Sequence, residues 1–300
     1  MLILAATPIG NLADASPRLI EAMVESKFIA AEDTRSLLKL ANSLGVKLNA
    51  RLFSLHEHNE GDRLNQILEI AQTEPVLVVS DAGMPTVSDP GFLLVRAAVE
   101  AKIEVTVIPG PSAVLSALAV SGLPTDRFTF EGFLPRKQGD RRKMFSSLSR
   151  EPRTMVFFES PHRILESLED AVLQLGGDRA ATVSRELTKK FEHTERGTLA
   201  QLIEWAKSEP KGEMVLVLAG GVKTAKNPNE LVELVLALAE SGTGLKQAVA
   251  EVATVMRVSK MTVYRLVHNG ELPAVRVGRS FRVPEQAVHD YLRDSFVETA

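Results

Sequence analysis

Short apolar runs alternate with helical patterns over the first 120 residues of the chain. The runs predict strands at residues 2–6, 28–31, 52–55, 76–80 and 105–108. Apolar positions spaced three and four apart predict helices at residues 16–25, 34–43, 62–72, 91–101 and 112–121. This alternation is typical of a parallel sheet with helices on both faces. The pattern therefore predicts an α/β fold.

The rhythm breaks at residues 121–143, which hold two prolines, three glycines and a basic end. We expect a domain boundary near Leu123. A second α/β unit follows, with strands predicted at residues 154–158, 181–184 and 214–219 and helices at residues 161–174 and 198–207. The expected organisation is two α/β domains, a linker with one helix and a tail, at residues 1–122, 123–222, 223–244 and 245–300.

The tail differs in kind from the rest of the chain. Its pattern predicts two helices joined by a turn at residues 257–259, then a small hairpin at residues 273–283 and a final helix. Residues 257–300 hold seven basic and five acidic residues, a net charge of +2, whereas the remaining 256 residues carry −5. The reversal of sign favours a separate module with a separate partner.

Composition narrows the function classes only slightly. Apolar residues make up 45% of the chain and charged residues 24%, as in ordinary soluble proteins. The absence of cysteine excludes disulfides, thiolate nucleophiles and cysteine-based zinc sites. The apolar start of the chain lacks a basic region and is too short to span a membrane, so we expect a core strand and a cytoplasmic protein.

Two loops carry the clearest sign of chemistry. VSDAGMPTVSDPG (79–91) and PGPSA (109–113) each follow a predicted strand, and ligands bind at the C-terminal edge of parallel sheets. Small residues and prolines there expose backbone groups to a ligand. One such loop would be explained by the need for a turn. Two of them in neighbouring units, with polar side chains, predict a ligand site; those side chains are Asp81, Ser88, Asp89 and Ser112.

Eight motifs, in order from Met1 to about Ala219, resemble one family. They are TPIGNLADASPR (7–18), AEDTR (31–35), LHEHNE (55–60), the two loops above, SGLPTDRFTFEGFLPRK (121–137), FFESPHRI (157–164) and RELTKKFE (185–192). The sequence is similar to the ribosomal RNA small subunit methyltransferase I family of the tetrapyrrole-methylase superfamily. The resemblance implies two α/β domains with the cofactor cleft between them, and a homodimer.

The resemblance also implies the reaction. The methyl donor would be S-adenosylmethionine, and the acceptor the 2′-hydroxyl of a cytidine in the decoding region of 16S rRNA, free or in the small ribosomal subunit. Carried over by motif, the cofactor-binding residues would be Pro8, Ile9, Asp81, Gly83, Met84, Val87, Ser112, Ala113, Phe158, Leu187 and Met214. Holding donor and acceptor in line supplies much of the acceleration, and no metal is needed.

A ribose hydroxyl is a poor nucleophile, so a nearby base would help. Glu32, Asp33 and Arg35 lie after a predicted strand and could orient the ribose or relay a proton. An equally good interpretation is that Asp33 or Thr34 only caps the next helix. For His56 and Glu60 we favour an RNA-facing or catalytic role, because a single His-x-His pair is a weak metal signal.

A basic cluster borders the predicted domain boundary. Its charges share one sign, which favours contact with RNA phosphates, although a solvated helix start is the plain alternative. The cluster and its possible extension comprise Arg136, Lys137, Arg141, Arg142 and Lys143, then Arg163, Arg185 and Lys189.

Residues 250–292 resemble the excisionase-type, MerR-like winged helix-turn-helix. The major groove of a duplex would be contacted by Lys260, Thr262, Tyr264 and Arg265, and the backbone or minor groove by Arg276, Arg279 and Arg282. The alternative is a non-binding helical tail. This module departs from the methyltransferase pattern, in which the chain ends in a short helical segment.

Three functions follow from these patterns. The leading hypothesis is an S-adenosylmethionine-dependent rRNA ribose methyltransferase with an added nucleic-acid-binding module. The second is a corrin or porphyrin methylase of the same superfamily, against which the basic cluster and the AEDTR and HEHNE runs argue. The third is a DNA-binding regulator that senses S-adenosylmethionine.

Overall fold

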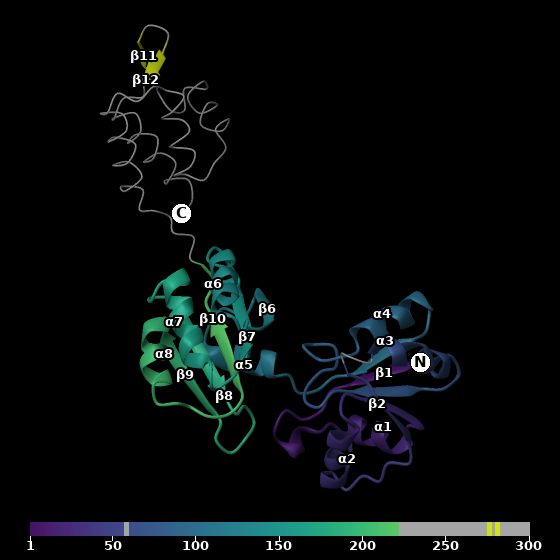
Figure 1. The fold of residues 1–300 in the computed structure, drawn as a ribbon. Coiled ribbons are helices and arrows are strands. Elements are labelled where there is room, and N and C mark those ends of the chain that lie inside the picture. The colour runs from purple at the N-terminus through teal and green to yellow at the C-terminus, as the bar shows by residue number, and fades with distance from the viewer. Residues whose placement is uncertain (57–59, 222–274, 278–279, 283–300) are drawn as a thin grey trace. The chain divides into compact units, whose positions relative to one another are not determined.

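The computed structural model describes residues 1–56, 60–221, 275–277 and 280–282. The chain divides into two compact units, Met1–Val222 and Lys223–Ala300. The first unit contains two sheets, each with its own helices (Figure 1). Within the described residues, no helix has both the length and the apolar character needed to cross a bilayer.

The first sheet has five strands in the order β3-β2-β4-β1-β5. Their bounds are Leu2–Ala5 (β1), Phe28–Ala31 (β2), Arg51–Ser54 (β3), Val76–Val79 (β4) and Val105–Ile108 (β5). All four pairings are parallel, which confirms the predicted parallel sheet. The central strand β4 is buried at every position because its VLVV run has an apolar side chain for each face.

Helices cover both faces of this sheet. Their bounds are Leu12–Asp14 (η1, a 3-10 turn), Pro17–Glu25 (α1), Thr34–Ser43 (α2), Glu60–Thr73 (α3) and Phe92–Glu100 (α4). One core joins the sheet to α1 and α2 through residues such as Met23 and Leu37. A second core joins the other face to α3 and α4 through Ile67 and Leu94. The two pairs of helices lie on opposite sides of the sheet (Figure 1).

The second sheet is mixed, in the order β6-β7-β10-β8-β9. Its strands are Phe128–Phe133 (β6), Thr154–Glu159 (β7), Ala180–Arg185 (β8), His193–Thr198 (β9) and Met214–Leu218 (β10). Only β6 and β7 run parallel. One face packs on Gln138–Ser147 (α6), Ile164–Leu175 (α7) and Leu199–Ala206 (α8).

The helix α5 (Ala113–Ser121) covers the other face of the second sheet. Its Val114, Ala117 and Leu118 pack against Val156 and Val217 of that sheet. The sequence pattern grouped this helix with the first α/β unit. The difference arises because α5 is apolar on all sides, so its pattern does not select the sheet that it covers.

The sequence pattern did not predict the strands β6 and β9 of the second sheet or the helix α6 that packs on it. The strand β6 contains Gly132 at φ +72° and a shift in register, and β9 is the polar edge sequence HTERGT. Both therefore lack a regular apolar alternation. In the tail, the predicted hairpin is confirmed by the antiparallel strands Val275–Val277 (β11) and Ser280–Arg282 (β12). The predicted tail helices lie outside the described residues.

Candidate cofactor and active site

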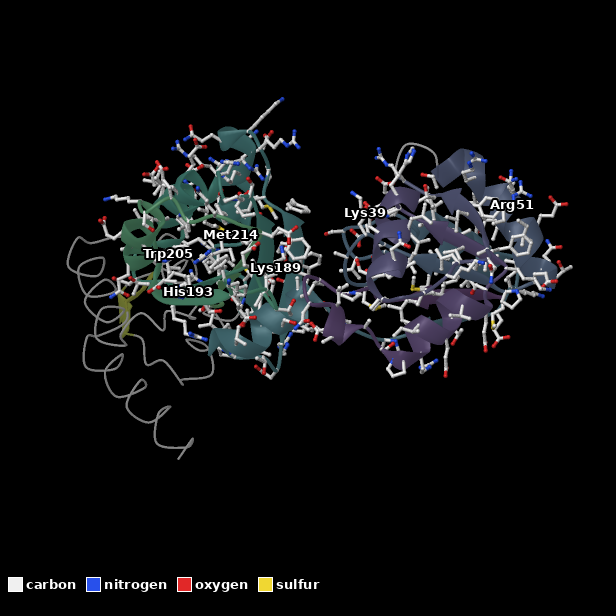
Figure 2. All side chains as sticks on the ribbon, turned by 90° about the horizontal axis from the view of Figure 1, so that it is seen from below. Lys39, Arg51, Lys189, His193, Trp205 and Met214 are labelled. Atoms are coloured by element: carbon white, nitrogen blue, oxygen red, sulfur yellow. The ribbon has the colours of Figure 1, made fainter. Side chains whose placement is uncertain are left out.

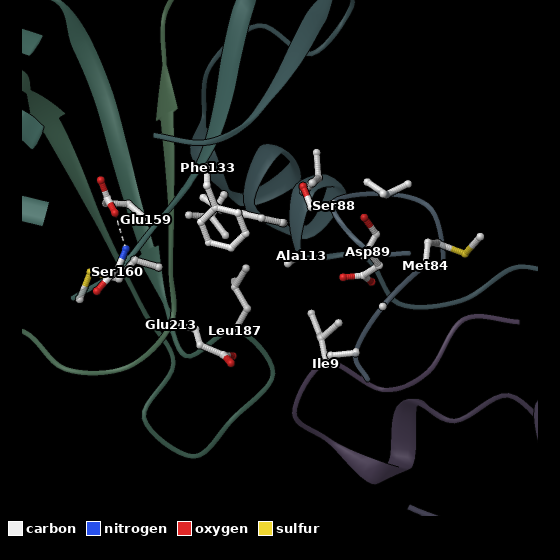
Figure 3. A pocket seen from close by; sticks show the side chains of 18 of the residues that line it. Ile9, Met84, Ser88, Asp89, Ala113, Phe133, Glu159, Ser160, Leu187 and Glu213 are labelled. Atoms are coloured by element: carbon white, nitrogen blue, oxygen red, sulfur yellow. Dashed lines mark hydrogen bonds between the residues drawn. The ribbon is translucent and has the colours of Figure 1, made fainter. Parts of the chain in front are cut away.

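A cavity of about 440 Å³ lies within the first unit, between loops of the first sheet and the edge of the second. We call the part built by loops after β1, β4 and β5 the first-sheet wall; it comprises Ile9, Ala82, Gly83, Met84, Val87, Ser88, Asp89 and Ser112. The second-sheet wall comprises Phe133, Phe158, Glu159, Ser160, Pro161, Leu187, Glu213, Met214 and Val215. The start of α5 adds Ala113 and Val114. Labelled side chains of the two walls face each other in Figure 3.

Backbone contacts hold the loops of the first-sheet wall together. Thr7 and Gly83 form an isolated antiparallel bridge, with N–H to carbonyl distances of 2.9 and 3.1 Å. The Thr7 hydroxyl donates to the carbonyl of Ser80 at 3.2 Å. A side chain at Gly110 would bring its Cβ to 2.9 Å from that of Ala6, so the PGPSA loop needs glycine there. Small residues in these loops thus allow backbone segments to approach each other closely.

Backbone strain gathers around the cavity. Thr86 and Ser88 have φ of +77° and +63°, and they flank the lining residue Val87. Glu186 and Thr188, at +51° and +66°, flank the lining residue Leu187 in the same way. Non-glycine residues in this region cost free energy and concentrate at functional sites. The strain therefore supports a binding role for the cavity on grounds independent of its size.

The second-sheet wall is mostly apolar. The Phe158 ring meets Phe130 and Phe133 edge to face, with centroids 4.9 and 5.3 Å apart. Leu187 and Met214, both buried, complete this apolar surface, of which Phe133 is the exposed member. Apolar walls with a few polar groups are typical of small-molecule sites. Among the described residues lining the cavity, the charged ones are all acidic: Asp89, Glu159 and Glu213. This combination fits S-adenosylmethionine, which joins apolar and aromatic parts to a sulfonium cation.

Acidic residues meet where β2 and β4 end side by side. The Asp81 N–H donates to the Glu32 carboxylate at 3.1 Å, and the Asp33 N–H donates to the Asp81 carboxylate at 3.2 Å. Burial, reinforced by the carboxylates of Glu32 and Asp81, raises the pKa of Asp89 to about 6. The edge of the sheet therefore places a carboxyl group that titrates near neutrality in the wall of the cavity.

Asp33 and Arg35 face a different environment. Asp33 caps α2 by accepting from the Arg35 N–H at 2.8 Å, and its carboxylate pairs with the Arg35 guanidinium at 2.7 Å. The hydrogen bond from that guanidinium lowers the pKa of Asp33 to about 2. The helix-cap interpretation of Asp33 is confirmed, and a carboxylate so firmly ionised is a weak proton acceptor.

Most of the predicted cofactor residues line the cavity. Those that do so are Ile9, Gly83, Met84, Val87, Ser112, Ala113, Phe158, Leu187 and Met214. Pro8 and Asp81 stand just outside the lining. None of the predicted catalytic residues Glu32, Asp33, Arg35 and His56 is part of it, and the side chain of Glu60 lies outside the described residues. The sequence analysis noted Asp89 as a polar loop residue but gave it no role.

The structure corrects the prediction for Arg141. Its side chain is 1% exposed and pairs with the equally buried Asp170 at 2.7 Å, so it cannot reach RNA phosphates. Arg142 also contacts Asp170, at 2.6 Å. Exposed members of the predicted RNA-binding set are Arg136, Lys137 and Lys143, whereas Arg163, Arg185 and Lys189 are half-buried.

Two half-buried members of this set lie at the edge of the cavity. Lys189 contacts Glu186 at 3.1 Å and the lining residue Glu213 at 2.8 Å. Lys189 is labelled in Figure 2 and belongs to the loop between β8 and β9, and a Cβ on Gly10 would collide with its side chain. Arg163 pairs with the buried lining residue Glu159. Both cations are therefore partly engaged by carboxylates of the second-sheet wall.

The predicted duplex-binding residues fall largely outside the described residues. Those outside are Lys260, Thr262, Tyr264, Arg265 and Arg279. The backbone positions of Arg276 and Arg282 are described: Arg276 is paired with Phe281, and Arg282 with Val275. Within the residues that the structure describes, no group of three or more His, Asp or Glu side chains is placed to hold a metal ion.

Known proteins resemble this chain over both units. The model of tetrapyrrole (corrin/porphyrin) methylases matches residues 1–203, and a helix-turn-helix domain model matches residues 249–295. A ribosomal RNA small subunit methyltransferase I of Mycobacterium tuberculosis (strain CDC 1551 / Oshkosh) is 47% identical over 253 residues, which are 84% of this chain and 88% of the relative. The enzyme of the same name from Escherichia coli O157:H7 is 42% identical and covers 88% of this chain and 93% of its own length.

Among solved structures, the methyltransferase CobJ matches with a TM-score of 0.55 at 19% identity, over 73% of this chain and 93% of its own. That likeness supports the fold of the two sheets. The named relatives support a closer assignment than the fold, because their identity extends over most of this chain and most of each relative. The chain belongs to the tetrapyrrole (corrin/porphyrin) methylase family and, within it, to the ribosomal RNA small subunit methyltransferase I family.

Proposed function

We propose that the chain methylates the ribose 2′-hydroxyl of a cytidine in the decoding region of 16S rRNA. Methylases of this family use S-adenosylmethionine as the methyl donor. The observation that carries the proposal is the cavity, which joins an apolar wall to loops at the ligand edge of a parallel sheet in a chain whose relatives are named for rRNA methylation.

Bound S-adenosylmethionine supplies an activated methyl group on a sulfonium centre. The residues of this chain then have to orient and shield it. Phe158, Leu187 and Met214 line the cavity and would pack around the apolar parts of the cofactor and exclude water. The backbone around Gly83 and Ser112 offers polar groups at the opposite wall. Fixing donor and acceptor in line turns a bimolecular encounter into a unimolecular step.

RNA binding is assigned to the exposed basic residues near the start of α6. Arg136, Lys137 and Lys143 lack the buried partner that neutralises Arg141. Arg185 and Lys189 are half-buried members of the proposed set, and Lys189 is paired with Glu186 and Glu213. Contacts between basic side chains and phosphates bind RNA without reading its sequence. Proposed with them are a homodimer, which the family resemblance implies, and a cytoplasmic location.

The tail carries a second proposed function, the binding of duplex nucleic acid. A helix-turn-helix model matches residues 249–295, and the tail has the opposite net charge to the rest of the chain. The proposed contacts are Lys260, Thr262, Tyr264, Arg265, Arg276, Arg279 and Arg282. The tail would supplement the methylase by adding a nucleic-acid contact of its own.

One experiment tests the reaction against its alternatives. Methyl transfer from labelled S-adenosylmethionine is measured in parallel to small ribosomal subunits, naked 16S rRNA, duplex DNA and uroporphyrinogen. We expect label on a cytidine ribose in one of the two RNA samples, located by nuclease digestion and mass analysis. Label on uroporphyrinogen alone would favour the tetrapyrrole methylase, and cofactor binding without transfer to any acceptor would favour the regulator.

A further inference from the structure

We propose that Asp89 is a catalytic residue that accepts the proton of the hydroxyl being methylated. This inference rests on the proposed function and deepens it, because it names the base for the same cavity. The first observation is position. Asp89 lies in the loop after β4, in the first-sheet wall, and its side chain is drawn among the residues around the cavity in Figure 3.

Asp89 differs from the other two carboxylates of the cavity. Glu159 is buried and fully engaged: it accepts from the Ser167 hydroxyl and the Ser160 N–H, both at 2.6 Å, and pairs with Arg163. Glu213 pairs with Lys189 at 2.8 Å. Among the described side chains, the groups that act on the Asp89 carboxyl include no Lys, Arg or His. Within the part of the chain that the structure describes, Asp89 is thus the lining carboxyl whose charge no cation compensates.

The described groups that act on Asp89 are acidic or neutral. Glu32 comes from the end of β2, Asp81 from the end of β4, and Ser80 offers a hydroxyl hydrogen bond. The Asp33–Arg35 pair lies beyond Asp81, whose carboxylate accepts from the Asp33 N–H. Across the cavity, the charged lining groups Glu159 and Glu213 carry their own cations. Burial and the acidic neighbours raise the pKa of Asp89 to about 6, close to the pH at which a general base works best.

The loop that carries Asp89 is held in a defined shape. Thr86 and Ser88 have left-handed backbone conformations, and the Thr86 N–H donates to the carbonyl of Pro90 at 3.3 Å, closing the loop across Asp89. Gly91 has φ +115°, which a residue with a side chain would adopt only under strain. Strain of this kind persists where the fold over-determines a position, as it does for groups that must be pre-oriented.

The proposed step is balanced. The carboxylate of Asp89 takes the proton of the 2′-hydroxyl as the ribose oxygen forms a bond to the methyl carbon. The carbon–sulfur bond breaks and its electron pair stays on sulfur. The positive charge of the sulfonium and the negative charge of Asp89 both disappear, leaving a neutral thioether, a methyl ether and a protonated Asp89. The acid then returns its proton to solvent.

The test compares full-length wild type with Asp89→Asn, which keeps the shape of the side chain and removes its basicity. The matched control is Asp178→Asn, an aspartate just before β8, at the far end of that strand from Leu187. Single-turnover rates on whichever RNA sample accepts methyl are measured from pH 5 to 9 at saturating cofactor. Cofactor affinity is measured separately by calorimetry with S-adenosylmethionine.

We expect the wild-type rate to rise with pH and to level off above an apparent pKa near 6. Asp89→Asn should lose at least about 100-fold in rate at pH 7.5, within the range typical of general bases. Its remaining rate should lack the step near pH 6, while its cofactor affinity and KM for RNA stay within about threefold of wild type. The Asp178→Asn control should match wild type throughout.

Three results would overturn the assignment while leaving the proposed function intact. They are an Asp89→Asn rate within threefold of wild type, a loss of cofactor affinity as large as the loss of rate, or a wild-type profile that is flat between pH 5 and 8. The last needs no variant, so it decides the matter even where Asp89→Asn does not fold. Wild type that methylates no RNA would instead overturn the proposed function and this assignment together.

Discussion

The two walls of the cavity differ in how they are built and in the balance of apolar and polar groups that they present. The second-sheet wall is built on strands and their ends, with Phe133, Phe158 and Met214 forming an apolar surface. The first-sheet wall is built from loops, with strained backbone at Thr86 and Ser88 and polar groups beside it. An apolar surface can bind the apolar parts of a ligand. Proton transfer instead needs a polar group that is not already paired with a charged partner. The second-sheet wall thus offers mainly an apolar surface, and the first-sheet wall adds polar groups beside its own predicted cofactor contacts, Gly83, Met84 and Ser112.

The same contrast holds for charge. Between the helices that pack on the second sheet, the buried Arg141 of α6 pairs with Asp170 of α7 at 2.7 Å. In the first-sheet wall, the charged groups of the described residues that act on the half-buried Asp89 are the carboxylates of Glu32 and Asp81. A buried charge with a partner is structural, because its desolvation is compensated. A carboxyl group surrounded by other acids is held close to its neutral state, which suits proton transfer.

The largest expected effect is on the buried pair. Arg141→Ala removes the buried partner of the Asp170 carboxylate and leaves only Arg142, at 2.6 Å, to pair with it, so the free energy of unfolding should fall by about 3 kcal/mol. The neighbouring Lys143→Ala removes an exposed charge and should change it by less than about 0.5 kcal/mol. Urea denaturation followed by circular dichroism measures both. Equal effects of the two substitutions would mean that Arg141 is a surface residue.

The next effect concerns cofactor binding at the first-sheet wall. Met84→Asp introduces a carboxylate into the cavity and should weaken S-adenosylmethionine binding by more than about 1 kcal/mol, because the buried part of that charge is desolvated. Met84→Leu, which conserves volume and polarity, should stay within about a factor of three. Calorimetry measures both affinities. Unchanged binding by the aspartate variant would remove Met84 from the cofactor contacts.

The raised pKa of Asp89 also predicts how the stability of the fold depends on pH. Its pKa is about 6 in the fold against an ordinary value of 3.8, so the folded state binds a proton more readily than the unfolded state between these values. Stability therefore falls as the pH rises from about 4 to 6 and stays lower above. Asp89→Asn should restore about 1 kcal/mol above pH 7, after allowance for the solvent exposure of the group.

Thermal melting at several pH values measures this effect. The difference in Tm between Asp89→Asn and wild type should amount to a few degrees at pH 7.5 and vanish near pH 4. The Asp178→Asn variant is again the control, because its carboxylate lies at the far end of the second sheet. A variant less stable than wild type at pH 7.5 would show that Asp89 stabilises the loop.

The contrast between the walls also explains what the sequence could predict. The strands of the first sheet follow from apolar runs such as VLVV, and two of the predicted strands, Phe28–Ala31 and Val105–Ile108, have the observed bounds. The second sheet was less predictable because β9 is polar and β6 is irregular. Local patterns carry the information for regular buried strands and lose it at edges and bulges.

The site shows the same limit. The loops with Gly83 and Ser112 could be found because strand, turn and small residues are adjacent in the sequence. Arg141 could not be separated from its basic neighbours, since Asp170 lies 29 residues further along the chain. The setting of Asp89 depends on Glu32, which comes from a different strand end. Partners that are distant in sequence determine whether a charge is structural, catalytic or exposed.

A smaller effect is expected for the exposed basic residues. Replacing Lys137 and Lys143 with Ala should reduce the slope of log affinity against log salt for RNA by roughly 0.7–0.9 for each phosphate that these side chains neutralise. Stability and cofactor affinity should not change, because both side chains are exposed. Filter binding at several salt concentrations gives the slope. An unchanged slope would identify these residues as a solvated helix start.

The smallest expected effect is on cofactor binding when the tail is removed. Every residue that lines the cavity lies between Ile9 and Val215, and the unit Met1–Val222 contains both sheets with their cores. A chain ending at Val222 should therefore bind S-adenosylmethionine within about a factor of two of the full-length affinity.

The isolated tail should bind duplex DNA weakly and with steep dependence on salt, since single small modules hold few phosphates. In full-length protein, Arg279→Glu should abolish that duplex binding and leave cofactor affinity unchanged. Loss of cofactor binding on truncation would mean that residues beyond Val222 belong to the methylase, and a tail that binds no duplex at low salt would be a packing or dimerisation element.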